Sequence, residues 1–442
     1  MSSCDGSIDS SFRSIIKISL PIILSCLSTN LMYVVDRIIL AGYSVEAMYA
    51  ATVSGNFVAI LAWVLVGIAS TAEVFVGQFN GAKQFDKLEI PIWQMVYMSL
   101  ASAVVFFPIG YFSEYINFLP DYALDYGVAY QRPLCYFGFL PSLIAGLSAF
   151  FIGQGKTRIV TVVVISGNVL NAFMSYYFVY YLNGGTSGAA TATVISEIVQ
   201  AIVLAVMFLQ GSNKNFSFNK KMLLNCIRIG WPVSIGHFFM ILAWYVISTI
   251  TGYSSKKLGV TWGIACNIYI ISSFFSEGAT KATAAIVSNM IGRRDIGSVF
   301  VVFKKFMLLV IAFTLLLSIP MVFFPDMTLN LLNLVNSDIS DLRTELLDVL
   351  KFSLGCLFIE SAVYIIGGVL MAGGDTKYTT IVSQVCFWGI VVIPTCILHA
   401  LGKLTSVVEV YTAMTLSFTL IFIFIYRRFM TKKWINKLNA LL

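Results

Sequence analysis

The sequence predicts an all-α integral membrane protein, with twelve transmembrane helices arranged in two pseudo-symmetric six-helix lobes. Two observations predict this class. First, 58% of the 442 residues are hydrophobic and only 11% are charged, a balance that no soluble domain of this size would tolerate on its surface. Second, the chain repeats itself when it is shifted by 211 positions.

Apolar stretches long enough to cross a hydrocarbon core of about 30 Å recur along the chain. They are continuous and do not alternate with period two, which predicts helices and excludes barrel strands. The first span is interpreted as a retained helix, because no small-residue cleavage site follows a short apolar core. The predicted spans are 15–41, 50–80, 90–117, 128–152, 158–182, 187–210, 227–252, 260–291, 299–324, 345–371, 378–401 and 404–426.

The 211-residue repeat relates residues that bend, cap or closely pack helices. The two halves are therefore expected to share one helix plan, and two copies of a helical bundle in a membrane are typical of a transporter. The matched pairs are Pro21 and Pro232, Asn56 and Asn267, Gly67 and Gly278, Val76 and Val287, and Gly81 and Gly292, while Gly155–Thr157 meets Gly374–Thr376 at a slightly larger offset.

The polar stretch 211–221 lies at the middle of the chain and is predicted to be a cytoplasmic linker. It would separate an N-terminal lobe (1–210) from a C-terminal lobe (222–442) that ends in a short basic cytoplasmic tail. Because each lobe has an even number of helices, both should run the same way through the membrane, related by an axis along its normal.

Basic residues predict the orientation. Twenty of the 28 lysines and arginines fall in segments that share one side when both termini are cytoplasmic. The expected location is the plasma (inner) membrane. The net charge of +7 is read as this topology signal, and nucleic acid is not an expected partner because no single basic patch stands out.

The sequence lacks the residue clusters that enzymes and metal sites use. The eight cysteines are scattered without a CxxC motif, and there are only two histidines. A membrane enzyme would need His, Asp or Cys clustered near one interface. We therefore expect no enzymatic activity, no metal and no cofactor, and a monomeric chain whose partners are the lipid bilayer and small molecules.

Five carboxylates within predicted spans are singled out, because even insertion-scale costs there are about 2.5–3.5 kcal/mol for each charge. Such residues are functional candidates by default. Glu277 precedes Lys281 by four residues, so a structural ion pair explains both as well as a function does. The five are Asp36, Glu73, Glu197, Glu277 and Glu360.

Asp36 is the sharpest candidate of the five. Its repeat counterpart is Ile247, so the shared packing plan does not require an acid there. The alternative is a pair with the adjacent Arg37, although neighbouring residues point about 100° apart on a helix. Glu73 lies near a helix end, where it would either be wetted or have a direct role.

Several motifs keep a family's order and spacing along essentially the whole chain. They are the stretch from Pro21 through Asp36 to Gly42, the run Val76–Ala82 with its counterpart Val287–Gly292, the turns Gly153–Thr157 and Ala372–Lys377, and the small-residue run Gly188–Thr193. With these motifs the chain resembles the multidrug and toxic compound extrusion (MATE) transporters. The resemblance implies a secondary active antiporter that exports drugs, dyes or small metabolites by alternating access, in exchange for protons or sodium ions.

The resemblance also implies a coupling site in the N-terminal lobe. It places Asp36 in the role of the family's aspartate, with Asn171, Thr193 and Ser175 around it. Ser175 stands where an acid is often found, so this site would hold one carboxylate and not two. Met240 stands where several family branches have a helix-seven glutamate, which excludes a coupling carboxylate at that position.

Asp375 resembles an acid near helix ten in some family branches, but it lies in a glycine turn before a helix and is therefore interpreted as an N-cap together with Thr376. Aromatic faces beside a carboxylate suit flat or lipophilic organic cations. Many of the aromatic candidates would equally be packing residues, since aromatics make up 14% of the chain. The candidate substrate-cavity residues are Tyr33, Glu197, Phe238, Phe239, Trp244, Tyr245, Glu277, Glu360 and Tyr364.

The alternative function is a flippase of lipid-linked precursors in the same wider superfamily. Basic residues lining a cavity would favour it, and Arg37 and Lys281 are the only basic candidates that the sequence suggests to be buried. A purely structural or receptor-like protein would have no use for two repeated lobes with intramembrane acids.

Overall fold

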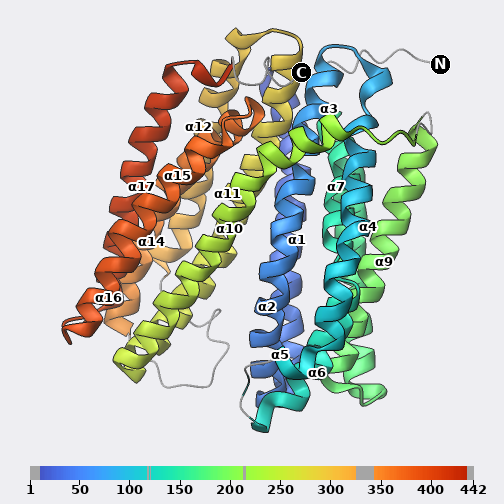
Figure 1. Ribbon diagram of the computed structural model, residues 1–442. Coiled ribbons are helices and arrows are strands. Elements are labelled where there is room, and N and C mark those ends of the chain that lie inside the picture. The colour runs from blue at the N-terminus through green and yellow to red at the C-terminus, as the bar shows by residue number, and fades with distance from the viewer. Residues whose placement is uncertain (1–9, 117–118, 120, 213–215, 325–342, 436–442) are drawn as a thin grey trace. The chain divides into compact units, whose positions relative to one another are not determined.

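The computed structural model describes residues 10–116, 119, 121–212, 216–324 and 343–435 (Figure 1). Across these ranges all regular secondary structure is helical. The end of the predicted basic tail, from residue 436, lies outside the described residues, as do residues 213–215 of the predicted linker.

The first half of the chain forms a series of long helices separated by short turns. Its elements are α1 (Phe12–Tyr43), α2 (Val45–Ser70), α3 (Ala72–Gly81), the 3₁₀ turn η1 (Phe85–Lys87), α4 (Ile90–Tyr111), α5 (Ser113–Ile116), α6 (Asp121–Tyr136), α7 (Leu140–Gly153), α8 (Thr157–Tyr176), the π-helical turn η2 (Tyr177–Tyr181) and α9 (Gly185–Gly211).

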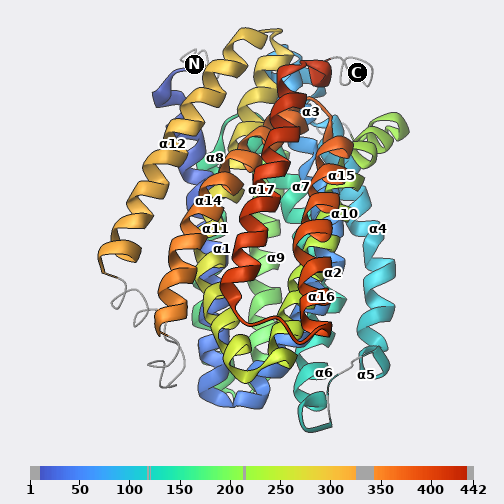
Figure 2. The same cartoon turned by 90° about the vertical axis from the view of Figure 1, so that its left-hand side faces the viewer.

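The second half repeats this plan with fewer breaks. Its described elements are α10 (Lys220–Ser254), α11 (Lys256–Gly292), α12 (Ile296–Phe323), α14 (Arg343–Ala372), α15 (Thr376–Phe387), the π-helical turn η4 (Trp388–Val392), α16 (Ile393–Ala400) and α17 (Val407–Met430). Figure 2 shows α17 beside α14 and α15, and both pairs are in contact.

Each of the twelve predicted spans coincides with one helix or with consecutive helices, which confirms the all-α fold class. By length and composition, ten continuous stretches of the described residues could cross a membrane, or eleven with the α6–α7 pair, which bends by 41° between Tyr136 and Leu140. The 37-residue α11, which holds Glu277 and Lys281, is not among those stretches.

The chain divides into two compact units. Unit 1 comprises Met1–His237 and Ala285–Asp295, and unit 2 comprises Phe238–Ala284 and Ile296–Leu442. Helices α10 and α11 therefore each contribute residues to both units. The lobe boundaries at 210 and 222 stay a prediction.

The described part of the central linker is held against α4. The Gln94 side chain donates to the carbonyl of Ser217 and accepts from the amide of Asn219, both at 3.0 Å. The Tyr97 hydroxyl donates to the Phe216 carbonyl, and the Phe216 ring lies 4.4 Å from that of Trp93. Backbone groups of the predicted linker thus form hydrogen bonds with side chains of α4, and the linker belongs to unit 1.

The repeat extends to the backbone of the turns. Lys83 and Arg294, which are 211 positions apart, both adopt the left-handed conformation, with φ of 59° and 62°. Gly155 and Gly374, at the larger offset, both have φ of 74°. In each case the following amide closes the helix end on a carbonyl five residues earlier, as in Gln84 to Phe79 and Asp295 to Met290, both at 2.9 Å.

The matched glycines Gly81 and Gly292 mark a close backbone crossing within unit 1. A Cβ on Gly81 would overlap the carbonyl oxygen of Asn289, and one on Gly292 would overlap that of Gln78. The Asn80 amide donates to Asn289 Oδ1 at 2.6 Å across the same crossing. The repeat therefore retains glycine where two helix ends meet backbone to backbone.

Candidate functional site

Helix α1 packs along α8 through a seam of polar contacts in unit 1. Thr157 Oγ1 donates to the carbonyl of Ile18, and Ser25 Oγ donates to Thr161 Oγ1, both at 3.0 Å. Further along, Asn168 donates to Ser28 Oγ at 2.9 Å. Each of these contacts gives a polar side chain a partner, as expected in an apolar environment.

The next contact along the seam is the predicted coupling site. Asp36 is only 5% exposed, and Ser175 and Asn171 are fully buried. Ser175 lies beside the Asp36 carboxyl. Asn171 donates to Thr193 Oγ1 at 3.0 Å. The structure thus brings together all four residues that the resemblance assigned to one site.

This group differs from the rest of the seam in its unsatisfied oxygens. Asp36 Oδ1 and Asn171 Oδ1 are buried and have no hydrogen-bond partner among the residues that the structure describes, and the buried Ser175 hydroxyl lies beside the Asp36 carboxyl. A buried carboxylate oxygen without a donor is costly. Carboxylate, amide and hydroxyl oxygens are also ligands of hard cations. The arrangement can therefore accept a proton or an oxygen-coordinated cation.

Arg37 does not neutralise Asp36 through an ion pair. Its guanidinium donates to Thr52 Oγ1 at 2.6 Å, and the described residues include no ion pair between Asp36 and Arg37. Tyr130, which is 7% exposed, lies near both of these residues and near Glu197. The alternative interpretation of Asp36 as half of a structural pair therefore finds no support in the geometry.

The two remaining unit 1 candidates sit differently from Asp36. Glu197 is half-buried on α9, and Tyr130 is its aromatic neighbour. Tyr33, on α1, is 46% exposed. Neither residue belongs to the group formed by Asp36, Asn171, Ser175 and Thr193.

Unit 2 contains a second buried acid, Glu360 on α14. It is 4% exposed, and its Oε2 has no hydrogen-bond partner among the described residues. Tyr269 lies next to it from α11, and Tyr364 lies one turn further along α14, near both Glu360 and Glu277. Glu360 and Tyr364, both predicted, therefore belong to one cluster.

Aromatic rings surround this acid. Trp244 lies 5.5 Å from Trp262 and 5.4 Å from Tyr269, and Tyr411 lies 5.9 Å from Trp262, all between ring centroids. Sequence reasoning named Trp244 but missed Tyr269, Trp262 and Tyr411. A signal existed for two of them, since Trp262 and Tyr269 are seven residues apart and so share a helix face.

The other unit 2 candidates divide into an ion pair and exposed aromatics. Glu277 accepts from Lys281 at 2.8 Å, which supports the structural interpretation of that pair. Phe238, Phe239 and Tyr245 are 39%, 40% and 66% exposed. They lie on α10 and outside the aromatic cluster around Glu360.

Of the two alternatives for Glu73 the wetted one is wrong, and Asp375 occupies the predicted N-cap position of α15 without capping it through its side chain. Glu73 is 2% exposed and thus not wetted at its helix end, because it begins the buried helix α3. Asp375 makes no side-chain cap at α15; its fully buried carboxylate instead accepts from Arg428 at 2.6 Å. A distant arginine supplies a charged partner there, which local sequence could not reveal.

No cluster of three or more His, Cys, Asp or Glu side chains suited to a metal ion occurs in the described ranges. The fold and these sites define a multi-pass helical membrane protein with a repeated architecture and with buried acids in both units. That combination is characteristic of secondary transporters and not of enzymes.

The chain belongs to the MatE family of transporters. The family model matches it twice, over residues 21–177 and 233–398, which also agrees with the internal repeat. Among similar proteins, a Bacillus subtilis protein described as the uncharacterized transporter YisQ is 21% identical, and the match covers 91% of this chain and 90% of that protein. A probable multidrug resistance protein NorM of Burkholderia mallei is 27% identical over half of each chain.

Solved structures show the same fold. An outward-facing multidrug resistance MATE family transporter of the MOP superfamily matches with a TM-score of 0.86 at 16% identity, covering 98% of this chain and 99% of that one. A MOP superfamily transporter of Pyrococcus furiosus matches with a TM-score of 0.85 at 17% identity, covering 97% and 98%. The latter is described as having a binding pocket of reverse polarity that suggests a different function.

Proposed function

We propose that this chain is a multidrug efflux antiporter that couples the export of small organic compounds to the entry of protons or sodium ions through Asp36. The observation that carries the proposal is the buried Asp36 carboxyl, with the Ser175 hydroxyl beside it and with Oδ1 of both Asp36 and Asn171 lacking partners among the described residues. Family membership and relatives described as multidrug resistance proteins support the export of drug-like compounds.

The coupling step would act on the α1–α8 seam. At the Asp36 contact, buried oxygens lack partners among the described residues, while the neighbouring contacts at Ile18, Ser25 and Ser28 are complete. A protonated Asp36 carboxyl can donate a hydrogen bond to a neighbouring oxygen, and a sodium ion can be coordinated by several of these oxygens at once. Either event strengthens one contact of α1 with α8 and biases the conformation of unit 1.

Substrate and coupling ion would then influence each other through that conformation. If the ion changes the affinity for substrate by some factor, the substrate changes the affinity for the ion by the same factor. Export follows when the ion favours the state that releases substrate outside. This is alternating access driven by the ion gradient.

The Glu360 cluster is the proposed substrate-recognising element. An acid with Tyr269 and Tyr364 beside it, and Trp244 packed on Tyr269, offers a negative charge and aromatic faces. Organic cations with flat rings suit these groups through ion pairing and cation–π contact. The proposed substrates are therefore cationic, lipophilic compounds of the ethidium type.

The distribution of basic residues supports the proposed orientation, in which both termini face the cytoplasm. The chain is further proposed to be a monomer in the plasma membrane. Vesicles turned inside out would accordingly present the substrate-uptake side. Labelling of single cysteines introduced at either end of the chain would test this orientation separately from transport.

The test uses everted vesicles from cells lacking their major efflux pumps and expressing the full chain. Energised vesicles should accumulate ethidium, and the accumulation should collapse with a protonophore or on sodium removal. Asp36→Asn should abolish it, whereas Glu114→Gln, at an exposed ion pair with Arg132, should not. Normal accumulation by Asp36→Asn at equal expression would refute the coupling role.

A further inference from the structure

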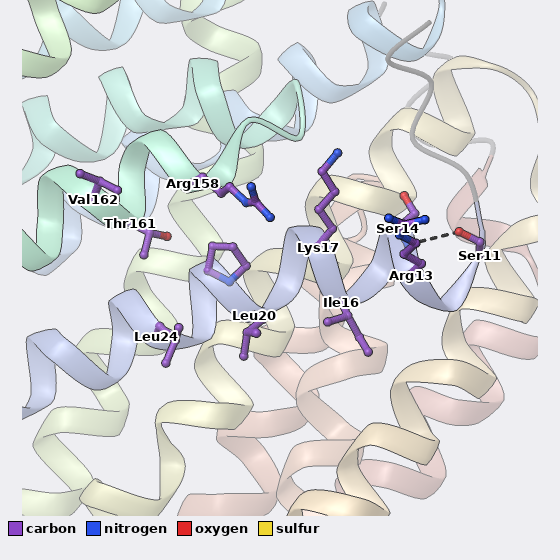
Figure 3. A pocket seen from close by; sticks show the side chains of 11 residues that line it. Ser11, Arg13, Ser14, Ile16, Lys17, Leu20, Leu24, Arg158, Thr161 and Val162 are labelled. Atoms are coloured by element: carbon purple, nitrogen blue, oxygen red, sulfur yellow. Dashed lines mark hydrogen bonds between the residues drawn. The ribbon is translucent and has the colours of Figure 1, made fainter. Parts of the chain in front are cut away.

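A pocket of about 850 Å³ lies in unit 1 at the start of α1, where this helix passes the start of α8 (Figure 3). The described residues that line it come from the N-cap Ser11, from the first part of α1 up to Leu24, and from α8, which contributes Arg158, Thr161 and Val162. None of these residues belongs to the Asp36 group or to the Glu360 cluster. The function proposed above leaves this pocket without a role.

The lining of the pocket changes from cationic to apolar along both helices. On α1, Arg13, Lys17, Leu20 and Leu24 are spaced by four, three and four residues, so they form one stripe with the charges first. On α8, Arg158 precedes Val162 by four residues. Each helix therefore presents a cation at its beginning and an apolar side chain one turn further in.

Among the residues that the structure describes, no carboxylate forms an ion pair with the three cations. Arg13, Lys17 and Arg158 are all exposed. Arg13 and Lys17 are four apart on one helix, where like charges destabilise the helix. An anionic group among the three would remove this repulsion.

The apolar half of the pocket is also uncovered. Leu20, Leu24 and Val162 are 49%, 42% and 64% exposed. Behind them the helices are closed by the hydrogen bonds from Thr157 to Ile18 and from Ser25 to Thr161. The result is a groove along the helices and not a passage between them.

The ends of α1 and α8 fix the depth at which this groove lies. Both helices are long and apolar enough to cross a membrane. A helix of 32 residues, such as α1, spans about 48 Å, so its first turns extend past a hydrocarbon core of about 30 Å. The cations then lie at the level of lipid headgroups, with the leucines at the level of acyl chains.

We propose that this α1–α8 pocket binds one anionic phospholipid. Its phosphate lies among Arg13, Lys17 and Arg158, and an acyl chain follows Leu20, Leu24 and Val162. Basic side chains at helix ends also reach lipid headgroups by snorkelling, even where there is no specific lipid-binding site. What distinguishes a site is a preference for the charged lipid that depends on these three cations and not on others.

The test measures lipid retained by the purified full-length protein with native mass spectrometry, after exchange into equal amounts of phosphatidylglycerol and phosphatidylcholine. Wild type should retain one phosphatidylglycerol with a preference of at least about tenfold, since each basic residue favours an anionic lipid. The triple variant Arg13→Gln, Lys17→Gln, Arg158→Gln should lose that preference.

The matched control is Lys87→Gln, Lys220→Gln, Lys221→Gln, which removes three exposed lysines outside the pocket. It should keep the preference. The single variant Arg158→Gln should lose part of it, and provides the test if the triple variant does not fold. A second variant, Leu24→Trp, fills the apolar half and should weaken retention of both lipids.

Three results would overturn the proposal. One is equal retention of the two lipids by wild type. Another is a loss of preference in the control as large as that in the pocket variant. The third is displacement of the lipid by inorganic phosphate at equal concentration, because this would show a simple anion site that makes no use of the acyl chain.

Discussion

Two repeat-related spans, Thr157–Tyr181 in unit 1 and Thr376–Ala400 in unit 2, have the same length of 25 residues but different interiors. When their first residues are matched, Asn171 falls on Ile390 and Ser175 on Pro394. The π-helical turn closes the first span at 177–181 but interrupts the second at 388–392. The span that borders Asp36 supplies polar partners, and its counterpart supplies none at those positions.

Glu360, a buried acid of unit 2, likewise has no acidic counterpart in the other unit. Gly153 ends α7 and Ala372 ends α14, and twelve residues before them stand Pro141 and Glu360. Pro141 lies in the first turn of α7, after the bend, whereas α14 is continuous through Glu360. Repeated residues thus build the helix plan, and unrepeated residues place the acids. This difference predicts distinct roles for the two units.

The largest expected effect comes from breaking the repeated scaffold. Gly81→Val and Gly292→Val should both prevent recovery of folded protein, because each adds a side chain that overlaps a backbone carbonyl across the same crossing. Size-exclusion chromatography of solubilised protein measures this. Gly355→Ala, where the added Cβ meets no atom within 4 Å, is the control and should behave as wild type. A well-folded Gly81→Val would show that the crossing is not required.

The next effect should separate the two acids. Glu360→Gln should weaken binding of a cationic dye by about tenfold or more, since it removes the charge of the aromatic cluster. Ion-driven uptake of a saturating dye concentration should remain. Direct binding to the purified protein and vesicle transport together measure both. If Glu360→Gln instead abolished coupling and left dye affinity intact, the roles assigned to the two units would be exchanged.

A smaller change should sharpen the unit 1 site. Ser175→Asp places a second carboxylate beside Asp36, as the family pattern often does. We expect tighter binding of the coupling ion, by roughly tenfold, because two carboxylates and the Asn171 oxygen then face one cation. Titration of ion-dependent transport measures this, with Ser175→Ala as the control. No change in ion dependence would argue against Ser175 lying at the ion.

The smallest expected effect concerns the end of the α1–α8 seam. The Tyr180 hydroxyl, on η2, donates to the carbonyl of Ile39 at 2.7 Å. Tyr180→Phe should cost about 1 kcal/mol of stability, measured as a lowered midpoint of thermal unfolding. Tyr181→Phe, at a side chain that is 69% exposed, should cost less. Equal losses would mean that η2 does not anchor α1.

The fold was predictable from the sequence because apolar length and glycine positions are local signals. The twelve spans and the turn residues Gly155 and Gly374 could be located without any tertiary information. The Asp36 group was predictable only through the family resemblance, since nothing local indicates that Ser175 meets α1. The partner of Asp375 could not be predicted, because Arg428 lies more than fifty residues away.

The aromatic cluster shows the same limit. Glu360 stood out because an acid in an apolar span is rare, but Tyr411 is one aromatic residue among many. Only the packing of α11, α14 and α17 reveals that it joins Trp262 and Tyr269. Charge within a membrane is thus a usable sequence signal, and aromatic side chains become informative only with contacts.

The most direct test of an N-terminal coupling site is ion movement by purified protein in proteoliposomes. An outward dye gradient should drive protons or sodium ions in the opposite direction, and a pH-sensitive or sodium-sensitive probe inside the vesicles records them. Wild type and Glu360→Gln should move the ion at saturating dye, whereas Asp36→Asn should move none. Dye-driven ion movement by Asp36→Asn at the wild-type rate would contradict the account.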